Sequence, residues 1–261
     1  MRNLLARDLA VRYKSSVLGF VWTLLNPLLQ MLVLTVVFQV LLPTPIPYFP
    51  LFILTGILAW NFCTAALSGA TQSIVGNVDL VRKVYFPRDM LTLSTVLASL
   101  VHFILALGLV FLFLPFVGEH GLTLAGTDLS ITWLVLWLPI IVVFQALFLA
   151  GLGLFLAAIN VFFRDTQAIM DVALMAWFFL TPVIYPLQTL YDRELGPVNL
   201  GWLMHVLNPM ASFITTYRLL LIERSAPDPA FLARTFATSV LVLLAGYAFF
   251  KWLEPRFGEE L

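Results

Sequence analysis

Long apolar runs without Asp, Glu, Lys or Arg take up about half of this chain of 261 residues. A helix needs roughly 20 apolar residues to cross a bilayer, so each run predicts a membrane-spanning helix. Only 11% of the residues are charged, against about 25% in an average soluble domain, which excludes a water-soluble globular protein. The uninterrupted runs are Val17 to Leu42, Leu51 to Gly76, Leu91 to Val117, Ile131 to Phe163 and Thr235 to Phe250.

One further run, from Thr166 to Leu190, carries Asp171 near its start and Pro182 and Pro186 near its end. A proline inside a helix removes a hydrogen bond and clashes with the preceding turn, so we expect this span to break before its outer end. Freed backbone groups at membrane depth must be covered by protein or water. The sequence predicts an all-α integral membrane protein with six transmembrane helices, of which this fifth one is broken.

The basic residues predict the orientation of these spans, because short cytoplasmic segments are enriched in Lys and Arg. The connections 43–50 and 118–130 contain no Lys or Arg, whereas the connection 191–234 holds several arginines but is long enough to tolerate them. We therefore expect both termini in the cytoplasm. The basic residues assigned to that side are Arg2, Arg7, Arg12, Lys14, Arg82, Lys83, Arg88, Arg164, Lys251 and Arg256.

Three segments outside the spans also have helical patterns. Residues 1–16 interleave apolar and basic positions, as does a helix lying in the membrane interface, although a simple positive anchor is the alternative. Residues 77–88 predict a short helix with apolar Val78, Val81 and Tyr85 on one face, which is either a partner site or a loop folded onto the bilayer. Asn208 followed by Pro209 predicts the start of an outer helix that ends near residue 224.

Most catalytic motifs are absent from the chain. No glycine precedes a lysine, so there is no phosphate-binding loop, and metalloprotease, nucleophile-elbow and paired-cysteine motifs are also missing. The net charge is zero, so no basic surface indicates nucleic acid. Cys63 is the only cysteine and has no partner for a disulfide within the chain. We expect no metal, no cofactor and no catalytic residue in this chain.

Ionisable side chains inside the spans are few. His102 lies in the middle of the third span, where it either relays protons or bonds to a neighbouring helix. Asp171 lies in the first turns of the fifth span and is one candidate for a relay acid. The alternative is that it pairs with a basic group such as Arg164, which lies beside Asp165, because an unpaired charge at this depth is costly.

Aromatic side chains inside the spans are candidates for lining a passage. Rings stack on the C–H faces of sugars without any charge, so a group of such rings suits a saccharide, although packing explains each ring taken singly. The candidates are Phe20, Trp22, Trp177, Phe178 and Tyr185.

Several segments resemble the membrane subunit of ABC-2 type polysaccharide exporters. They are residues 7–19 (RDLAVRYKSSVLG), residues 82–88 (RKVYFPR), residues 160–165 (NVFFRD), residues 181–185 (TPVIY) and Asn208-Pro209. The resemblance implies one transmembrane domain over residues 1–261, with an interfacial helix at 1–16, a coupling loop at 77–88, and a broken span with outer gate helices at 181–224.

The resemblance also implies partners and roles. The chain would form a homodimer with two copies of a separate ATPase that carries ATP and Mg, and would export lipid-linked polysaccharide such as O-antigen, capsule or teichoic acid across the bacterial plasma membrane. Arg7, Arg12 and Lys14 would meet the lipid head group. The coupling residues would be Asp79, Arg82, Lys83, Tyr85, Phe86 and Arg88. An ABC-2 exporter of a drug or simple lipid, a secondary carrier or channel, and an intramembrane enzyme are the alternatives.

Overall fold

The computed structural model describes residues 21–83, 87–113, 133–191, 194–195 and 198–260. Within these ranges, five helical segments are long and apolar enough to cross a membrane, as judged by length and composition. They are Val21–Leu41 (α2, Val21–Thr35, with η1, Val36–Leu41), α3 (Phe49–Gln72), α5 (Asp89–Phe113), Val135–Phe162 (the end of η4, Trp133–Trp137, with α6, Leu138–Phe162) and Pro229–Arg256 (α11, Pro229–Leu253, with η6, Glu254–Arg256).

The expected broken span is α7 (Thr166–Leu180), which is apolar but shorter than the five candidate spans. It ends at Thr181, whose backbone is extended, directly before Pro182. The residue before a proline avoids the helical region, and this explains the end point. The predicted break is therefore confirmed, whereas the structure gives no sixth helix of full spanning length among the described residues.

Short elements follow the break. They are α8 (Gln188–Tyr191), the antiparallel pair β1 (Glu194–Leu195) and β2 (Val198–Asn199), α9 (Leu200–Leu207), α10 (Pro209–Arg218) and η5 (Leu219–Glu223). The helix predicted from Asn208 is confirmed, because the Asn208 side chain accepts a hydrogen bond from the backbone of Ala211 and caps α10. The two-residue strands and α9 were not anticipated in the all-α expectation.

The last span begins earlier than the charge pattern indicated. The expected start was Thr235, just after Arg234, but α11 starts at Pro229. Asp228 caps it by accepting a hydrogen bond from the backbone of Ala230. Capping and an N-terminal proline determine where a helix begins, and a single arginine in the second turn does not interrupt it.

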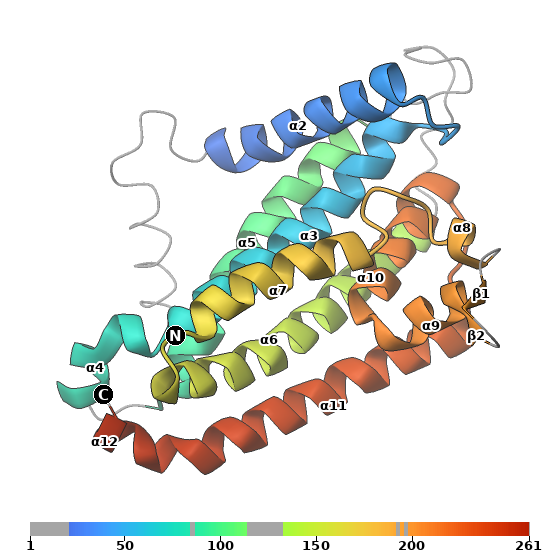
Figure 1. The fold of residues 1–261 in the computed structure, drawn as a ribbon. Coiled ribbons are helices and arrows are strands. Elements are labelled where there is room, and N and C mark those ends of the chain that lie inside the picture. The colour runs from blue at the N-terminus through green and yellow to red at the C-terminus, as the bar shows by residue number, and fades with distance from the viewer. Residues whose placement is uncertain (1–20, 84–86, 114–132, 192–193, 196–197, 261) are drawn as a thin grey trace.

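The main core surrounds α3. This helix is buried along most of its length and packs against α5, α6 and α7, while α2 lies across α3 and α5 (Figure 1). α11 runs along α6, where a Cβ atom added to Gly151 or Gly246 would overlap the backbone of the other helix. Small residues allow two helix backbones to approach this closely at membrane depth.

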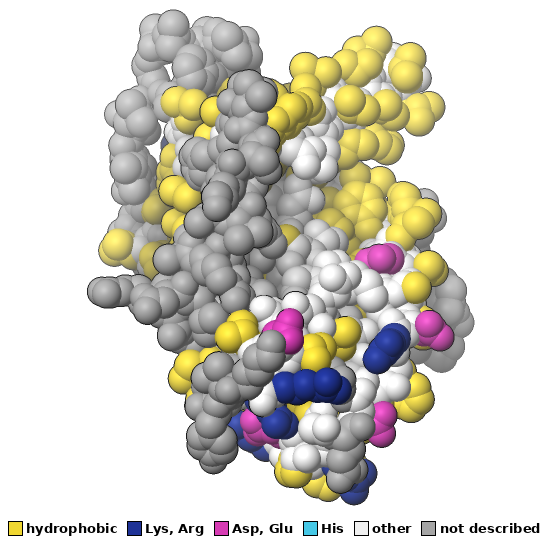
Figure 2. All heavy atoms as spheres, turned by 90° about the vertical axis from the view of Figure 1, so that its left-hand side faces the viewer, with side chains coloured by type: hydrophobic (Ala, Val, Ile, Leu, Met, Phe, Trp, Pro, Cys, Tyr) yellow, Lys and Arg dark blue, Asp and Glu magenta, His cyan; other side chains and the backbone are white. Residues whose placement is uncertain are grey.

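A smaller apolar cluster lies where α4 (Val78–Lys83), the start of α5 and the end of α11 meet, together with α12 (Phe257–Glu260). We call this region the charged end, because Lys, Arg, Asp and Glu side chains gather there in Figure 2, whereas hydrophobic side chains dominate the upper right of the same view. Val81, expected on the exposed apolar face of residues 77–88, is only 6% exposed and belongs to this cluster. The apolar side of α4 that carries Val81 is therefore packed against other helices of the same chain.

Candidate functional site: a polar groove over α3

A hollowed surface lies over the face of α3 that carries Asn61, Thr64 and Ser68. Three cavities of about 700, 520 and 310 Å³ adjoin one another here. Asn61 lines the first two, Thr64 and Ser68 line the first and the third, and Trp60 and Phe178 line the second and the third. We call this surface the α3 groove. Its floor is α3, and its walls come from α2, α5 and α7.

Amide side chains line the wall that α2 contributes. The Asn61 amide donates to Gln30 Oε1 at 3.1 Å, and the Gln30 amide donates to Asn26 Oδ1 at 3.4 Å. The first bond links α3 to α2, and the second lies within α2. Polar side chains at membrane depth normally face the interior of the helix bundle or a water-filled cavity, and these amides line a cavity while leaving part of their hydrogen-bonding capacity for a ligand.

Hydroxyl groups continue the polar lining toward α5. Thr64 donates to the carbonyl oxygens of Trp60 and Asn61 in its own helix, and Ser99 donates likewise to Thr95. The ring of His102 lies on the α5 wall, with Nδ1 2.7 Å from the Ala98 carbonyl oxygen. The hydrogen bond at this nitrogen is within the residue's own helix.

Asp171 stands at the rim of the groove on α7. It is exposed, it lines the smallest of the three cavities, and its Oδ1 accepts a hydrogen bond from Gln167 at 3.0 Å. The described residues contain no ion pair between Asp171 and Arg164, so the pairing expected from sequence is not formed. Arg164 and Asp165 are both exposed before the start of α7. Asp171 is the one charged side chain among the described residues that line the three cavities.

The five aromatic residues proposed from sequence have different environments. Trp22 lines the largest cavity and Phe178 lines the two smaller ones. Tyr185 donates its hydroxyl hydrogen to the Phe179 carbonyl oxygen at 3.2 Å, in the turn that follows α7, and does not line the groove. Phe20 lies outside the described residues.

Trp177 is held by its neighbours. Its indole nitrogen donates to Asn208 Oδ1 at 3.0 Å, and its ring packs edge-on against Trp60 and Phe148. Asn208 also donates to the Thr181 hydroxyl oxygen at 2.9 Å. Trp177 therefore joins the end of α7 to the start of α10 and packs against Trp60, which lines the groove.

Arg218 fixes the break after α7. Its guanidinium donates to the carbonyl oxygens of Pro182 at 2.6 Å, Val183 at 2.5 Å and Phe52 at 3.3 Å, and lies 3.4 Å from the centre of the Phe52 ring. Burial lowers the pKa of Arg218 to about 9, while nearby Glu223 acts in the opposite direction, so the side chain is protonated at neutral pH. A Cβ atom on Gly56 would come within 2.8 Å of this guanidinium, so glycine provides its space.

Part of the proposed coupling loop lies at the charged end. Asp79 and Arg82 are exposed on α4, and Arg88 is half-buried beside the C-terminal end of α11. Lys83 ends α4. Tyr85 and Phe86 lie outside the described residues, as do Arg7, Arg12 and Lys14.

The polar residues on the groove floor have a signal in the sequence that charges and aromatic rings alone do not reveal. Asn61, Thr64 and Ser68 follow the three- and four-residue spacing of one helix face, so a search for polar residues at helical spacing would have found them. The contacts of Arg218 had no such signal, because they depend on a turn 35 and 36 residues earlier in the chain.

The groove offers amides, hydroxyl groups and aromatic rings, with one carboxylate at the rim. Such a surface can hydrogen-bond and stack against a neutral polar molecule. Comparison with known proteins then gives the family, because the ABC-2 type transporter family matches residues 1–222. The chain belongs to the ABC-2 type transporter family. This ABC-2 chain is a multi-pass membrane protein by its apolar helices and its family.

The curated relatives of this ABC-2 chain match it over most of its length. The O-antigen export system permease protein RfbA of Myxococcus xanthus is 38% identical over 259 residues, which is 99% of this chain and 94% of the relative. Its counterpart in Klebsiella pneumoniae is 30% identical over 98% of this chain and 92% of the relative. The polysialic acid transport protein KpsM of Escherichia coli is 21% identical over 78% of this chain and 76% of the relative.

Proposed function

We propose that this chain is the permease subunit of an ATP-driven exporter that moves lipid-linked polysaccharide across the bacterial plasma membrane. The lining of the α3 groove carries the proposal, because amides, hydroxyl groups and aromatic rings are the groups that bind neutral sugars. The names of the relatives support the same substrate class, since they refer to export of O-antigen and transport of polysialic acid. A chain of sugars is too polar to pass through lipid and too long for a closed carrier pocket, so it needs a continuous polar path.

The energy comes from a separate subunit. This chain has no glycine followed by lysine and so has no phosphate-binding loop. ATP and Mg bind to that partner. Asp79, Arg82 and Lys83 on α4, with Tyr85, Phe86 and Arg88 after it, form the surface that docks on it. The exposure of Asp79 and Arg82 supports this assignment.

Two copies of the chain, each bound to one ATPase subunit, enclose the path. Each copy has six spans, with α7 as the broken fifth one, and both termini are cytoplasmic. Apolar side chains exposed on α2 and α7 support a facing copy of these helices across the path. Residues 181–224 form the outer gate, and Arg218 keeps the backbone turn after α7 in place when the gate moves.

The substrate follows the groove in the proposed mechanism. Its charged lipid head group meets Arg7, Arg12 and Lys14 at the inner surface, and its sugars pass Phe20, Trp22 and Phe178. ATP-driven closure of the partner subunits pushes on α4 and separates the two copies. Weak stacking and single hydrogen bonds at each step allow the polymer to slide.

Co-expression with the ATPase encoded beside this chain's gene tests the proposal. We expect a stable complex that hydrolyses ATP, and we expect cells lacking the chain to retain lipid-linked polysaccharide inside. Charge reversal by Arg82→Glu should break the complex, whereas Arg224→Glu, an exposed arginine after η5, should leave it intact. If no ATPase binds, the chain is not the membrane subunit of an ATP-driven exporter, and His102 and Asp171 become the groups to test for ion coupling. If a drug or simple lipid is exported instead of polysaccharide, the substrate assignment is wrong.

A further inference from the structure

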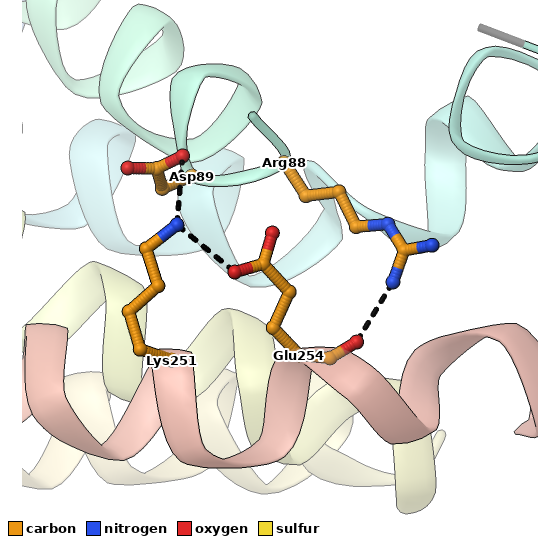
Figure 3. Close-up of polar contacts among 4 residues, drawn as sticks. All are labelled: Arg88, Asp89, Lys251 and Glu254. Carbon is orange, nitrogen blue, oxygen red and sulfur yellow. Dashed lines mark hydrogen bonds and ion pairs between the residues drawn. The ribbon is translucent and has the colours of Figure 1, made fainter. Parts of the chain in front are cut away.

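Four side chains join the coupling loop to the C-terminal end of the chain (Figure 3). Arg88 Nη1 donates to the carbonyl oxygen of Glu254 at 2.7 Å. Lys251 Nζ lies 3.5 Å from Asp89 Oδ1 and donates to Glu254 Oε2 at 2.9 Å. We call this group the C-terminal clasp. Its members come from positions up to 166 residues apart in the chain.

The clasp suits the two helix ends that it connects. Asp89 is in the first turn of α5, where the helix dipole favours a negative side chain, and Lys251 is in the last turn of α11, where the dipole favours a positive one. Arg88 bonds to the carbonyl oxygen of Glu254, directly after α11, which also accepts a hydrogen bond from the backbone of Phe257. The start of α5 is therefore bound to the end of α11 by complementary charges.

Apolar packing beneath the clasp joins the same elements. Val81 of α4 and Leu91 of α5 belong to one buried cluster with Phe250, Leu253 and Phe257 from the C-terminal end. Phe250 and Phe257 pack edge to face with ring centres 5.3 Å apart. The C-terminal residues thus lie against the buried side of the helix that we propose to dock on the ATPase.

α11 leads from the clasp into the body of the molecule. It packs along α6, where Gly151 and Gly246 bring the two backbones together. α6 in turn packs against α3, the floor of the α3 groove. Close-packed elements transmit a displacement because their interiors compress little.

We propose that the C-terminal clasp is a second arm of the coupling apparatus, which makes α11 and α6 move with the coupling loop when the ATPase closes. The loop is continuous with α5 through the chain itself, but its connection to α11 depends on the clasp and on the apolar packing beneath it. Lys251, Asp89, Arg88 and Glu254 are positioning residues in this scheme, since none of them touches substrate or nucleotide. The proposal rests on the proposed function, because it requires a partner ATPase.

Charge reversal and charge exchange across the clasp test the proposal. The variants are Asp89→Lys, Lys251→Asp and the double exchange, with Glu260→Lys as the control on the exposed part of α12. The complex with its ATPase is purified and reconstituted for each variant, and assembly, ATP hydrolysis and export per ATP hydrolysed are measured. We expect the single variants to assemble and to hydrolyse ATP while export per ATP falls about tenfold. The double exchange restores a pair of opposite charges between positions 89 and 251, but each charge then opposes the dipole of its helix, so it should recover a part of this loss.

The outcomes separate the two proposals. A wild-type chain that binds no ATPase defeats the proposed function itself. A wild-type complex that exports, together with single variants that export equally well per ATP, defeats the clasp alone. If the single variants fail to assemble, the milder Lys251→Met and Asp89→Asn replace them, and unchanged export per ATP in both would overturn the inference. Loss of export that the exchange does not recover also counts against it.

Discussion

Single buried polar residues hold together the irregular part of this fold. A proline break leaves backbone carbonyl groups without helical partners, and at membrane depth such groups must be satisfied within the protein. Arg218 does this for Pro182 and Val183 with one planar group, and also bonds to Phe52 on α3. Lysine could not replace it, because an ammonium group lacks the fork geometry that reaches several acceptors together.

We expect Arg218→Met to destabilise the protein by about 3 kcal/mol or more, since each buried acceptor left unpaired costs about 1–3 kcal/mol. Arg218→Lys should recover only a part of this loss. The control is Arg224→Met, at an exposed arginine. Thermal unfolding of the purified chain in detergent measures both, and equal stability of the Arg218 and Arg224 variants would contradict the role assigned to Arg218.

Two asparagine caps offer a second comparison at this scale. Asn199 caps α9 by accepting from the backbone of Trp202 and makes one further, exposed hydrogen bond to the Tyr191 carbonyl oxygen, whereas Asn208 caps α10 and also makes less exposed bonds to Trp177 and Thr181. Loss of a cap alone costs about 1 kcal/mol. We therefore expect Asn199→Ala to lower the free energy of unfolding by about 1 kcal/mol and Asn208→Ala by about 2–4 kcal/mol, because two further polar groups lose their partner. A similar cost at both positions in chemical unfolding would show that the bonds of Asn208 to α7 contribute nothing.

At the scale of elements, the closest helix pair is α6 with α11. The contact depends on two glycines, since a side chain on Gly246 would overlap the backbone of Gly151. We expect Gly246→Ala to separate the helices and to destabilise the chain by about 1–3 kcal/mol, the usual cost of overpacking. Gly108→Ala on α5 is the matched control, because its Cβ would meet nothing within 4 Å. Helix propensity alone predicts that this control raises the free energy of unfolding by up to about 1 kcal/mol. A similar increase for Gly246→Ala in the same unfolding assay would refute the close approach of α6 and α11.

Much of the element order was predictable, because it follows from local chemistry. Apolar runs gave the five candidate spans, Pro182 gave the end of α7, and Asn208 with Pro209 gave the start of α10. The start of α11 was misplaced because charge was used as a boundary where Asp228 and Pro229 decide it. The clasp could not be predicted, since Arg88 and Glu254 are 166 residues apart and only the tertiary packing brings them together.

The groove was only partly foreseen for a different reason. Trp22 and Phe178 were singled out as rings within apolar spans, and the structure places both on the groove. Asn61, Thr64 and Ser68 were overlooked because each is a single polar residue inside an apolar run. Their shared face becomes evident only when α3 is treated as one helix with polar positions at regular spacing.

At the scale of the whole molecule, the proposal requires water in the α3 groove and lipid around the outer helix faces. The native Cys63 is fully buried, so a thiol reagent should not label it, and any labelling of a variant reports the introduced cysteine. A thiolate reacts only where water supports its charge. Ser68→Cys places a thiol on the groove floor, and Leu244→Cys places one on the exposed apolar face of α11.

We expect a small, membrane-impermeant thiol reagent to label Ser68→Cys in membranes and to leave Leu244→Cys unlabelled. Leu244 is 59% exposed, so accessibility alone would favour the opposite result. The contrast therefore reports hydration rather than space around the side chain. Labelling of both variants at the same rate would mean that α11 does not face lipid, and an unlabelled Ser68→Cys would mean that the groove is dry. A dry groove could not carry a polysaccharide, because the hydroxyl groups of the sugars would lose their water without enough protein partners to replace it.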